Sequence, residues 1–178
     1  ATSYVNWLRD LTGTLVEPTP PTSSSLEIAY NNLDNYKAVS DSIIYNTAKF
    51  KPLFGAKADP SLQARFQVVK NPNVGITDNE IKTQVIAAVN NFFDPSNWDF
   101  GDTFYFSELA AFIHSQIGDI VSSVVLVPLN TQKAFGDLYE IRSAPNQIFV
   151  NAATVNDIQV IQALTSTNIR TAPGSGVI

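Results

Sequence analysis

The sequence predicts an α+β fold, with helices packed on one face of a small mixed sheet and a β-rich C-terminal extension. Segments of helical period alternate with segments of period two, in the order helix, strand, strand, helix, helix, strand. No internal repeat is evident, and 178 residues suffice for one sizeable domain with an appendage. We divide the chain into an N-terminal arm and Pro-rich connector (1–25), an α+β domain (26–129) and a β-rich extension and tail (130–178).

The first 25 residues are expected to form an arm. Apolar residues within 4–11 recur at i, i+3, i+4 and i+7, which predicts a short amphipathic helix ending near Gly13. The stretch EPTPPTSSS (17–25) contains three prolines among Thr and Ser, which favours an extended, semi-rigid connector.

The next segment predicts one helix and two strands. Ser24 and Glu27 have the capping-box spacing, and one helical face then carries Leu26, Ala29, Leu33 and Tyr36. Residues 43–54 are predicted to form a strand. A second strand is predicted over 64–69, where Ala64, Phe66 and Val68 alternate with polar residues.

Two capped helices are predicted to follow. Thr77 and Glu80 form a second capping box before a helix with Ile81, Val85, Val89 and Phe92 on one face. Pro95 ends this helix, because the residue before a proline is disfavoured in the α region. Ser107 is predicted to cap a helix over 108–117, with Gly118 as the residue that follows its end.

The rest of the chain is predicted to be rich in strands. Residues 120–129 are strongly β-branched and indicate a buried strand. Residues 138–142 and 147–150 flank the turn-forming SAPN sequence and predict a hairpin. A last strand is predicted over 157–161.

Composition argues against several functional classes. The net charge is −5 with scattered basic residues, whereas nucleic-acid binding needs clustered Lys and Arg. The sequence has no run of about 18 apolar residues, the length needed to span a membrane, and its N-terminus lacks signal-peptide character. Cysteine is absent, which excludes disulfides and thiolate chemistry. Methionine is also absent, even at position 1, so we expect a processed chain or, more plausibly, a fragment.

No catalytic or metal motif emerges. The single histidine, His114, has no carboxylate four residues away, so a structural role is favoured over catalysis. Asp94, Asp99 and Asp102 fail the calcium-loop pattern, since the required Gly does not fall at its sixth position, and are interpreted as turn residues. Chance convergence of two acids for glycoside hydrolysis is left open as a minor alternative. We therefore predict no enzyme activity, no cofactor, no metal and no small-molecule substrate.

Seven aromatic residues fall within 92–106. We expect most of them to form core, because aromatic side chains dominate burial energetics. A minority left exposed, such as Trp98 or Tyr105, would act as binding hot spots.

An ordered pattern of segments carries a family resemblance. It comprises SIIYNTAKFKPL (42–53), the capped helix over 77–93, NWDFGD (97–102), YFSEL (105–109) and GDIVSSV (118–124). This pattern resembles the baseplate J family of contractile-tailed bacteriophages, in particular the large baseplate wedge subunit of T4-like phages. The resemblance covers roughly 26–129, with weaker support to about 165.

The resemblance implies a structural component of the tail baseplate, in the virion, assembled in the host cytoplasm. It would mediate contacts between wedges in the ring around the tail tube, with itself as a homodimer and with other wedge proteins as partners. The family's proteins are much longer, which fits a fragment. Two alternatives stay open: a carbohydrate- or receptor-binding module that stacks sugars on Trp98 and Tyr105, and a cell-wall hydrolase.

Two sets of residues are the candidate sites. Because unpaired edge strands invite pairing, the partner interface is predicted on the hairpin and final strand. Its expected residues are Tyr139, Ile141, Ile148, Val150, Ile158 and Val160. The structural turn that would hold the two helices in register comprises Trp98, Phe100, Gly101 and Asp102.

Overall fold

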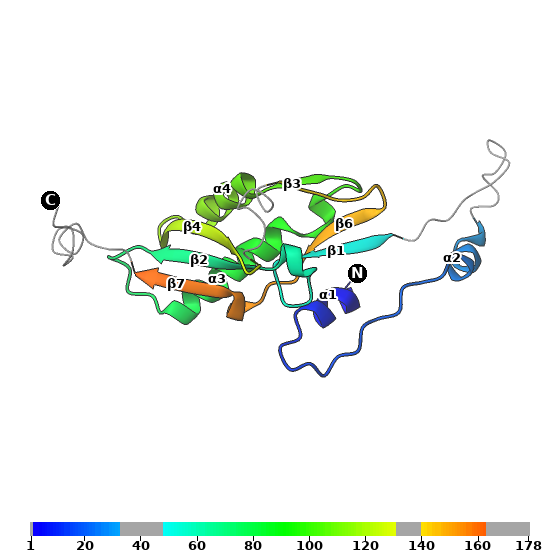
Figure 1. Ribbon diagram of the computed structural model, residues 1–178, viewed down its shortest axis with the longest axis horizontal. Helices are drawn as coiled ribbons and strands as arrows, with labels where there is room; N and C mark the ends of the chain where they lie inside the picture. Colours follow the sequence, from blue (N-terminus) through cyan, green and yellow to red (C-terminus); the bar gives the residue numbers. More distant parts are fainter. Residues whose placement is uncertain (1, 33–47, 131–139, 163–178) are drawn as a thin grey trace.

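The computed structural model describes residues 2–32, 48–130 and 140–162 (Figure 1). Its centre is a three-stranded mixed sheet of order β4-β2-β7. Strand β2 (Ala64–Lys70) pairs antiparallel with β4 (Val121–Pro128) and parallel with β7 (Ile158–Gln162). The predicted α+β class, with helices packed against sheets, is confirmed.

Helices α3 (Asp78–Phe92) and α4 (Phe106–Ile117) form the core with one face of this sheet, and Figure 1 shows α3 behind β2 and β7. Successive side chains of a strand point to opposite faces. Accordingly Ala64, Phe66 and Val68 of β2 are buried, as predicted, whereas Arg65 between them is exposed. The largest side chains enclosed in this core are aromatic: Phe54, Phe66, Phe93, Phe104 and Phe149.

Two further strand pairs extend the body. Strand β1 (Lys49–Leu53) pairs parallel with β6 (Gln147–Asn151), and β3 (Thr103–Tyr105) pairs antiparallel with β5 (Glu140–Arg142). Short 3-10 helices η2 (Pro60–Leu62), η3 (Pro95–Asn97) and η5 (Val155–Asp157) connect these elements.

The predicted hairpin is wrong. A turn is present, since the Gln147 amide donates to the Ala144 carbonyl at 2.8 Å, but β5 and β6 pair with other strands. The reason is burial. Ile141 of β5 lies opposite Phe104 in the core, while β6 directs Phe149 and Val150 into two separate apolar clusters. A hairpin would give up these contacts.

The backbone is unusual where β1 ends. Phe54 is fully buried yet has φ 75, a left-handed conformation that bulky residues rarely adopt. The next residue, Gly55, passes so close to the β6 end that an added Cβ would lie 1.8 Å from the Ala152 carbonyl oxygen. Glycine is therefore required at this crossing.

The N-terminal arm contacts the body through its first helix. Helix α1 (Thr2–Leu8) buries Leu8 against Val150 and Ala152, and Tyr4 stacks on Phe50 with ring centroids 4.9 Å apart. It ends before Gly13, so Leu11, expected on its apolar face, is exposed. Helix α2 (Ser23–Ala29) has no buried residue and lies away from the body in Figure 1.

Helix caps agree with the sequence in part. The capping box of Thr77 and Glu80 is present at α3 as predicted. At α2 the cap is Thr22 rather than Ser24. Helix α4 begins at Phe106 without a side-chain cap, so Ser107 lies inside it, and Gly118 has an ordinary right-handed φ of −62. Gly118 follows the last helical residue, as predicted, and a turn over 118–120 leads into β4.

Candidate functional site

The predicted interface residues are mainly interior. Tyr139 lies outside the described residues. Ile141, Val150 and Ile158 are 4%, 1% and 2% exposed, and only Ile148 and Val160 are partly accessible. A charge placed at Ile141 would therefore enter a packed core and destabilise the fold.

Part of the accessible apolar surface of the strands lies instead on the open face of the three-stranded sheet. We define this open face by the outward residues Arg65, Gln67 and Val69 of β2 and by their Cα partners on the flanking strands. These partners are Ser123, Val125 and Val127 of β4 and Gln159 and Ile161 of β7. Among them Val125 and Ile161 are exposed hydrophobic residues, at 39% and 37%.

This face was not predicted, because residues 120–129 were interpreted as a buried strand. Near its end, the run VSSVVLVP has apolar residues at successive positions, and therefore on both faces of the strand. This pattern is typical of a strand that is covered on both faces. Among the described residues no helix covers the side of Val125 and Val127; α3 and α4 pack on the other side, and α1 packs on β6.

The predicted structural turn is well connected. The Trp98 indole Nε1 donates to the Phe92 carbonyl at 2.8 Å, and its ring stacks on Phe93 at 5.5 Å. Gly101 has φ 79, and its amide donates to the Gln147 carbonyl at 3.3 Å. The turn thus ties the end of α3 to β6. Its further expected role, keeping α3 and α4 in register, stays a prediction.

The remaining turn residues diverge. The Asp102 carbonyl accepts from the Ser143 amide at 3.0 Å, while its carboxylate accepts from the Thr103 amide at 3.0 Å. Phe100, expected to be part of the same structural unit, is instead 56% exposed. Sequence position alone therefore did not separate the anchoring residues of the turn from its surface residues.

A pocket of about 640 Å³ opens beside this turn. We call the lining of this pocket the aromatic–acidic wall. Its residues are Phe92, Asn97, Trp98, Asp102, Thr103, Tyr105, Glu108 and Phe112. Trp98 and Tyr105 were the predicted exposed aromatics, whereas Glu108 and Phe112 of α4 were missed. Their i, i+4 spacing, which places both on one helix face, is the signal that could have identified them.

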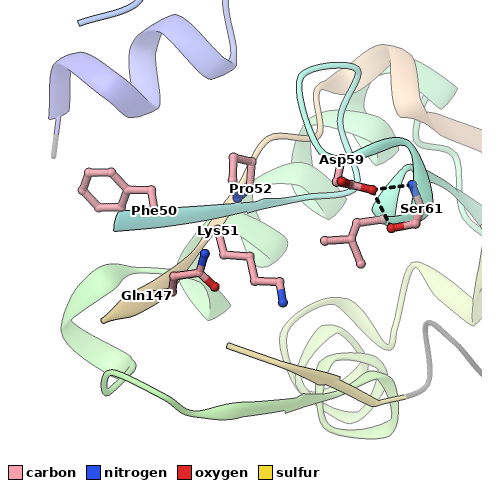
Figure 2. Close-up of a pocket in the computed structure, with 7 residues that line it drawn as sticks. Phe50, Lys51, Pro52, Asp59, Ser61 and Gln147 are labelled. Atoms are coloured by element: carbon pink, nitrogen blue, oxygen red, sulfur yellow. Dashed lines mark hydrogen bonds between the residues drawn. The ribbon is translucent and has the colours of Figure 1, made fainter. Parts of the chain in front are cut away.

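A smaller pocket of about 360 Å³ lies beside β1 and η2 (Figure 2). Its polar groups take part in local hydrogen bonds. The Lys51 ammonium donates to the Arg142 carbonyl. Asp59 accepts from the Ser61 amide at 2.8 Å and from the Ser61 hydroxyl at 2.5 Å, and dashed lines mark these two bonds in Figure 2. These groups hold neighbouring elements together and leave the pocket without a convergent set of ligand-binding side chains.

The residues considered for catalysis or metal binding do not converge. Within residues 2–32, 48–130 and 140–162 there is no group of three or more His, Asp or Glu side chains that could hold a metal. Asp94 caps η3, where hydrogen bonds from the Ser96 hydroxyl and amide lower the pKa of its carboxyl. His114 is exposed near the end of α4. No helix in the described part of the chain is long and apolar enough to cross a membrane.

In comparisons with known proteins, no protein-family model and no curated protein matches this chain. The resemblance to the baseplate J family therefore depends on the segments quoted from the sequence. Four of those segments correspond to described elements: the capped helix α3, the Trp98 turn, the start of α4 and the start of β4.

Proposed function

We propose that this chain is a structural assembly module of a contractile phage tail baseplate, related to the C-terminal part of a wedge subunit. Its partners would be a second copy of itself and other wedge proteins, and its location the virion baseplate. The observation that carries the proposal is the open face of the β4-β2-β7 sheet, where Val125 and Ile161 are accessible. The resemblance to the baseplate J family is the reason for proposing the tail baseplate as the assembly in which this surface makes its contacts.

The size of the open face sets the expected strength of self-association. Three strands spaced about 4.8 Å apart and roughly 17–27 Å long present about 300 Å². A stable specific interface buries about 800 Å² per partner. The open face alone is therefore too small for tight dimerisation, and an isolated chain should associate weakly. Neighbouring subunits that hold copies together would raise their effective concentration.

Val125 on this face provides the test. Light scattering coupled to size exclusion, over a wide range of protein concentration, should show mass rising from monomer towards dimer. Changing Val125 to Glu should shift this rise to higher concentration, because a carboxylate would be desolvated in the contact. The matched control is Val16→Glu, since Val16 is 87% exposed on the arm, outside the open face.

The two variants separate the interface from general effects of charge. Equal weakening by Val125→Glu and Val16→Glu would indicate that net charge, not the open face, controls association. A wild-type chain that stays monomeric at every concentration would remove self-association from the proposal. Thermal unfolding of Val125→Glu should match the wild type, because this side chain already contacts solvent.

A further inference from the structure

We propose that the pocket beside the Trp98 turn binds an arginine side chain presented by a protein partner. The pocket is formed by the end of α3, by η3, β3 and α4, and by the Trp98 turn, so it involves different elements from the open face of the sheet. The inference goes beyond self-association, and its failure would leave the proposed assembly role standing.

Aromatic rings form the apolar half of the aromatic–acidic wall. Trp98 is held in place by its indole hydrogen bond to Phe92 and by stacking on Phe93. Phe92 and Phe112 contact each other with ring centroids 5.5 Å apart, and Tyr105 at the rim is 36% exposed. Rings fixed by such contacts lose little entropy when a planar group stacks on them.

Hydrogen-bond acceptors form the polar half. Asp102 and Glu108 supply two exposed carboxylates. Asn97 donates its amide nitrogen to the Asn91 carbonyl at 3.0 Å, so its side-chain oxygen is the atom left to accept from a ligand. The wall therefore suits a ligand rich in N–H donors.

Charge complementarity selects a cation. The eight lining residues include two carboxylates and no Lys or Arg. Phosphates, uronic acids and other anions would meet repulsion here. Arg142, on the strand paired with β3, lies outside this lining, and its Nε donates to Glu140 at 2.7 Å.

Among cations, guanidinium fits both halves of the wall. It is planar and stacks on aromatic faces, and its five N–H donors match carboxylate geometry. The lysine ammonium is a strongly hydrated point charge and gains less from stacking. Arginine is also enriched among the residues that dominate protein–protein binding energy, which fits a partner contact.

The test uses the peptide acetyl-Gly-Arg-Gly-amide as probe, with its citrulline counterpart as a neutral isostere. Binding is followed by the ¹⁵N–¹H resonance of the Trp98 indole, which is distinguished from that of Trp7 with the variant Trp7→Phe. The arginine peptide should shift this resonance saturably. Citrulline should bind about tenfold more weakly, because it loses the cation–π and ion-pair contributions. Added salt should weaken arginine binding, since the carboxylates are exposed.

Charge-neutral variants locate the site. The change Glu108→Gln, alone and with Asp102→Asn, should weaken the arginine peptide progressively towards the citrulline value. The matched control Glu27→Gln removes the same charge from α2 and should leave binding unchanged. Equal binding of citrulline, insensitivity to both pocket variants, or no shift with arginine would each overturn the proposal. A saturable shift with methyl α-glucopyranoside in place of arginine would also overturn it and favour a sugar site.

Discussion

Substitutions at Phe54 test whether its left-handed backbone conformation is strained. That conformation favours glycine at this position, whereas the buried site favours a large side chain. Its ring meets Phe66 at 5.1 Å and Phe93 and Phe104 at 5.8 Å, so truncation at this position should cost about 3–5 kcal/mol. Its left-handed φ of 75 adds a second term. A non-glycine residue in that region costs roughly 1–2 kcal/mol, which glycine avoids.

The two terms predict an inverted order of variants. Glycine normally destabilises relative to alanine by about 0.4–1 kcal/mol, through the entropy of the unfolded chain. At Phe54 the relieved strain exceeds this loss, so Phe54→Gly should be more stable than Phe54→Ala by about 1 kcal/mol. The matched site is Phe66, equally buried but in the ordinary extended strand β2. There Phe66→Ala should be more stable than Phe66→Gly by about 0.5–1 kcal/mol.

Urea unfolding followed by tryptophan emission measures all four variants. A constant concentration of sucrose keeps them folded at the start, since truncation removes a large part of a typical stability of about 5–15 kcal/mol. Alanine exceeding glycine at Phe54 by the same margin as at Phe66 would refute the assigned strain.

Two further changes test other parts of the fold. Gly55→Ala should abolish folding, as measured by circular dichroism, because the added Cβ would lie 1.8 Å from the Ala152 carbonyl oxygen. The control Gly75→Ala should be tolerated, because a Cβ there meets nothing within 4 Å. The lowered pKa of Asp94 means that its contribution to stability is present above its unfolded pKa of about 3.9 and is lost as pH falls through the folded pKa. Asp94→Asn should therefore flatten the fall in melting temperature below about pH 4, and an unchanged profile would contradict the assigned cap.

Local signals predicted several elements well. The capping box of Thr77 and Glu80 marks the start of α3, because the two side chains satisfy backbone groups within one turn. The alternation of Ala64, Phe66 and Val68 identified β2 and its buried side, since both depend only on neighbouring residues. Strand β4 was also located, although not its open side.

Long-range pairing limited the rest. The SAPN turn is local and exists, but the partners of its flanking strands lie far away in sequence, at Phe104 for Ile141 and at Pro52 for Val150. Alternation alone cannot say which apolar strand residues face a core and which face a partner. The candidate interface therefore named interior residues, while exposed Val125 was overlooked.

The pocket was predictable only in part. Its aromatic members Trp98 and Tyr105 stood out by density in the sequence. Of its two acidic members, Glu108 came from a separate helix, and the start of that helix was placed two residues late because Ser107 has a capping side chain. Packing of α4 beside the turn brings the two groups together.

The parallel pairing of early with late strands affects how the chain folds during synthesis. Strand β1 meets β6, β2 meets β7, and even α1 rests on Val150 and Ala152. The N-terminal half thus emerges from the ribosome before its pairing partners exist, leaving the aromatic interior of Phe54 and Phe66 without its full enclosure. Such late closure slows folding and prolongs exposure of unpaired edges to other nascent chains. Truncation before β6 should therefore yield aggregates rather than a smaller folded unit.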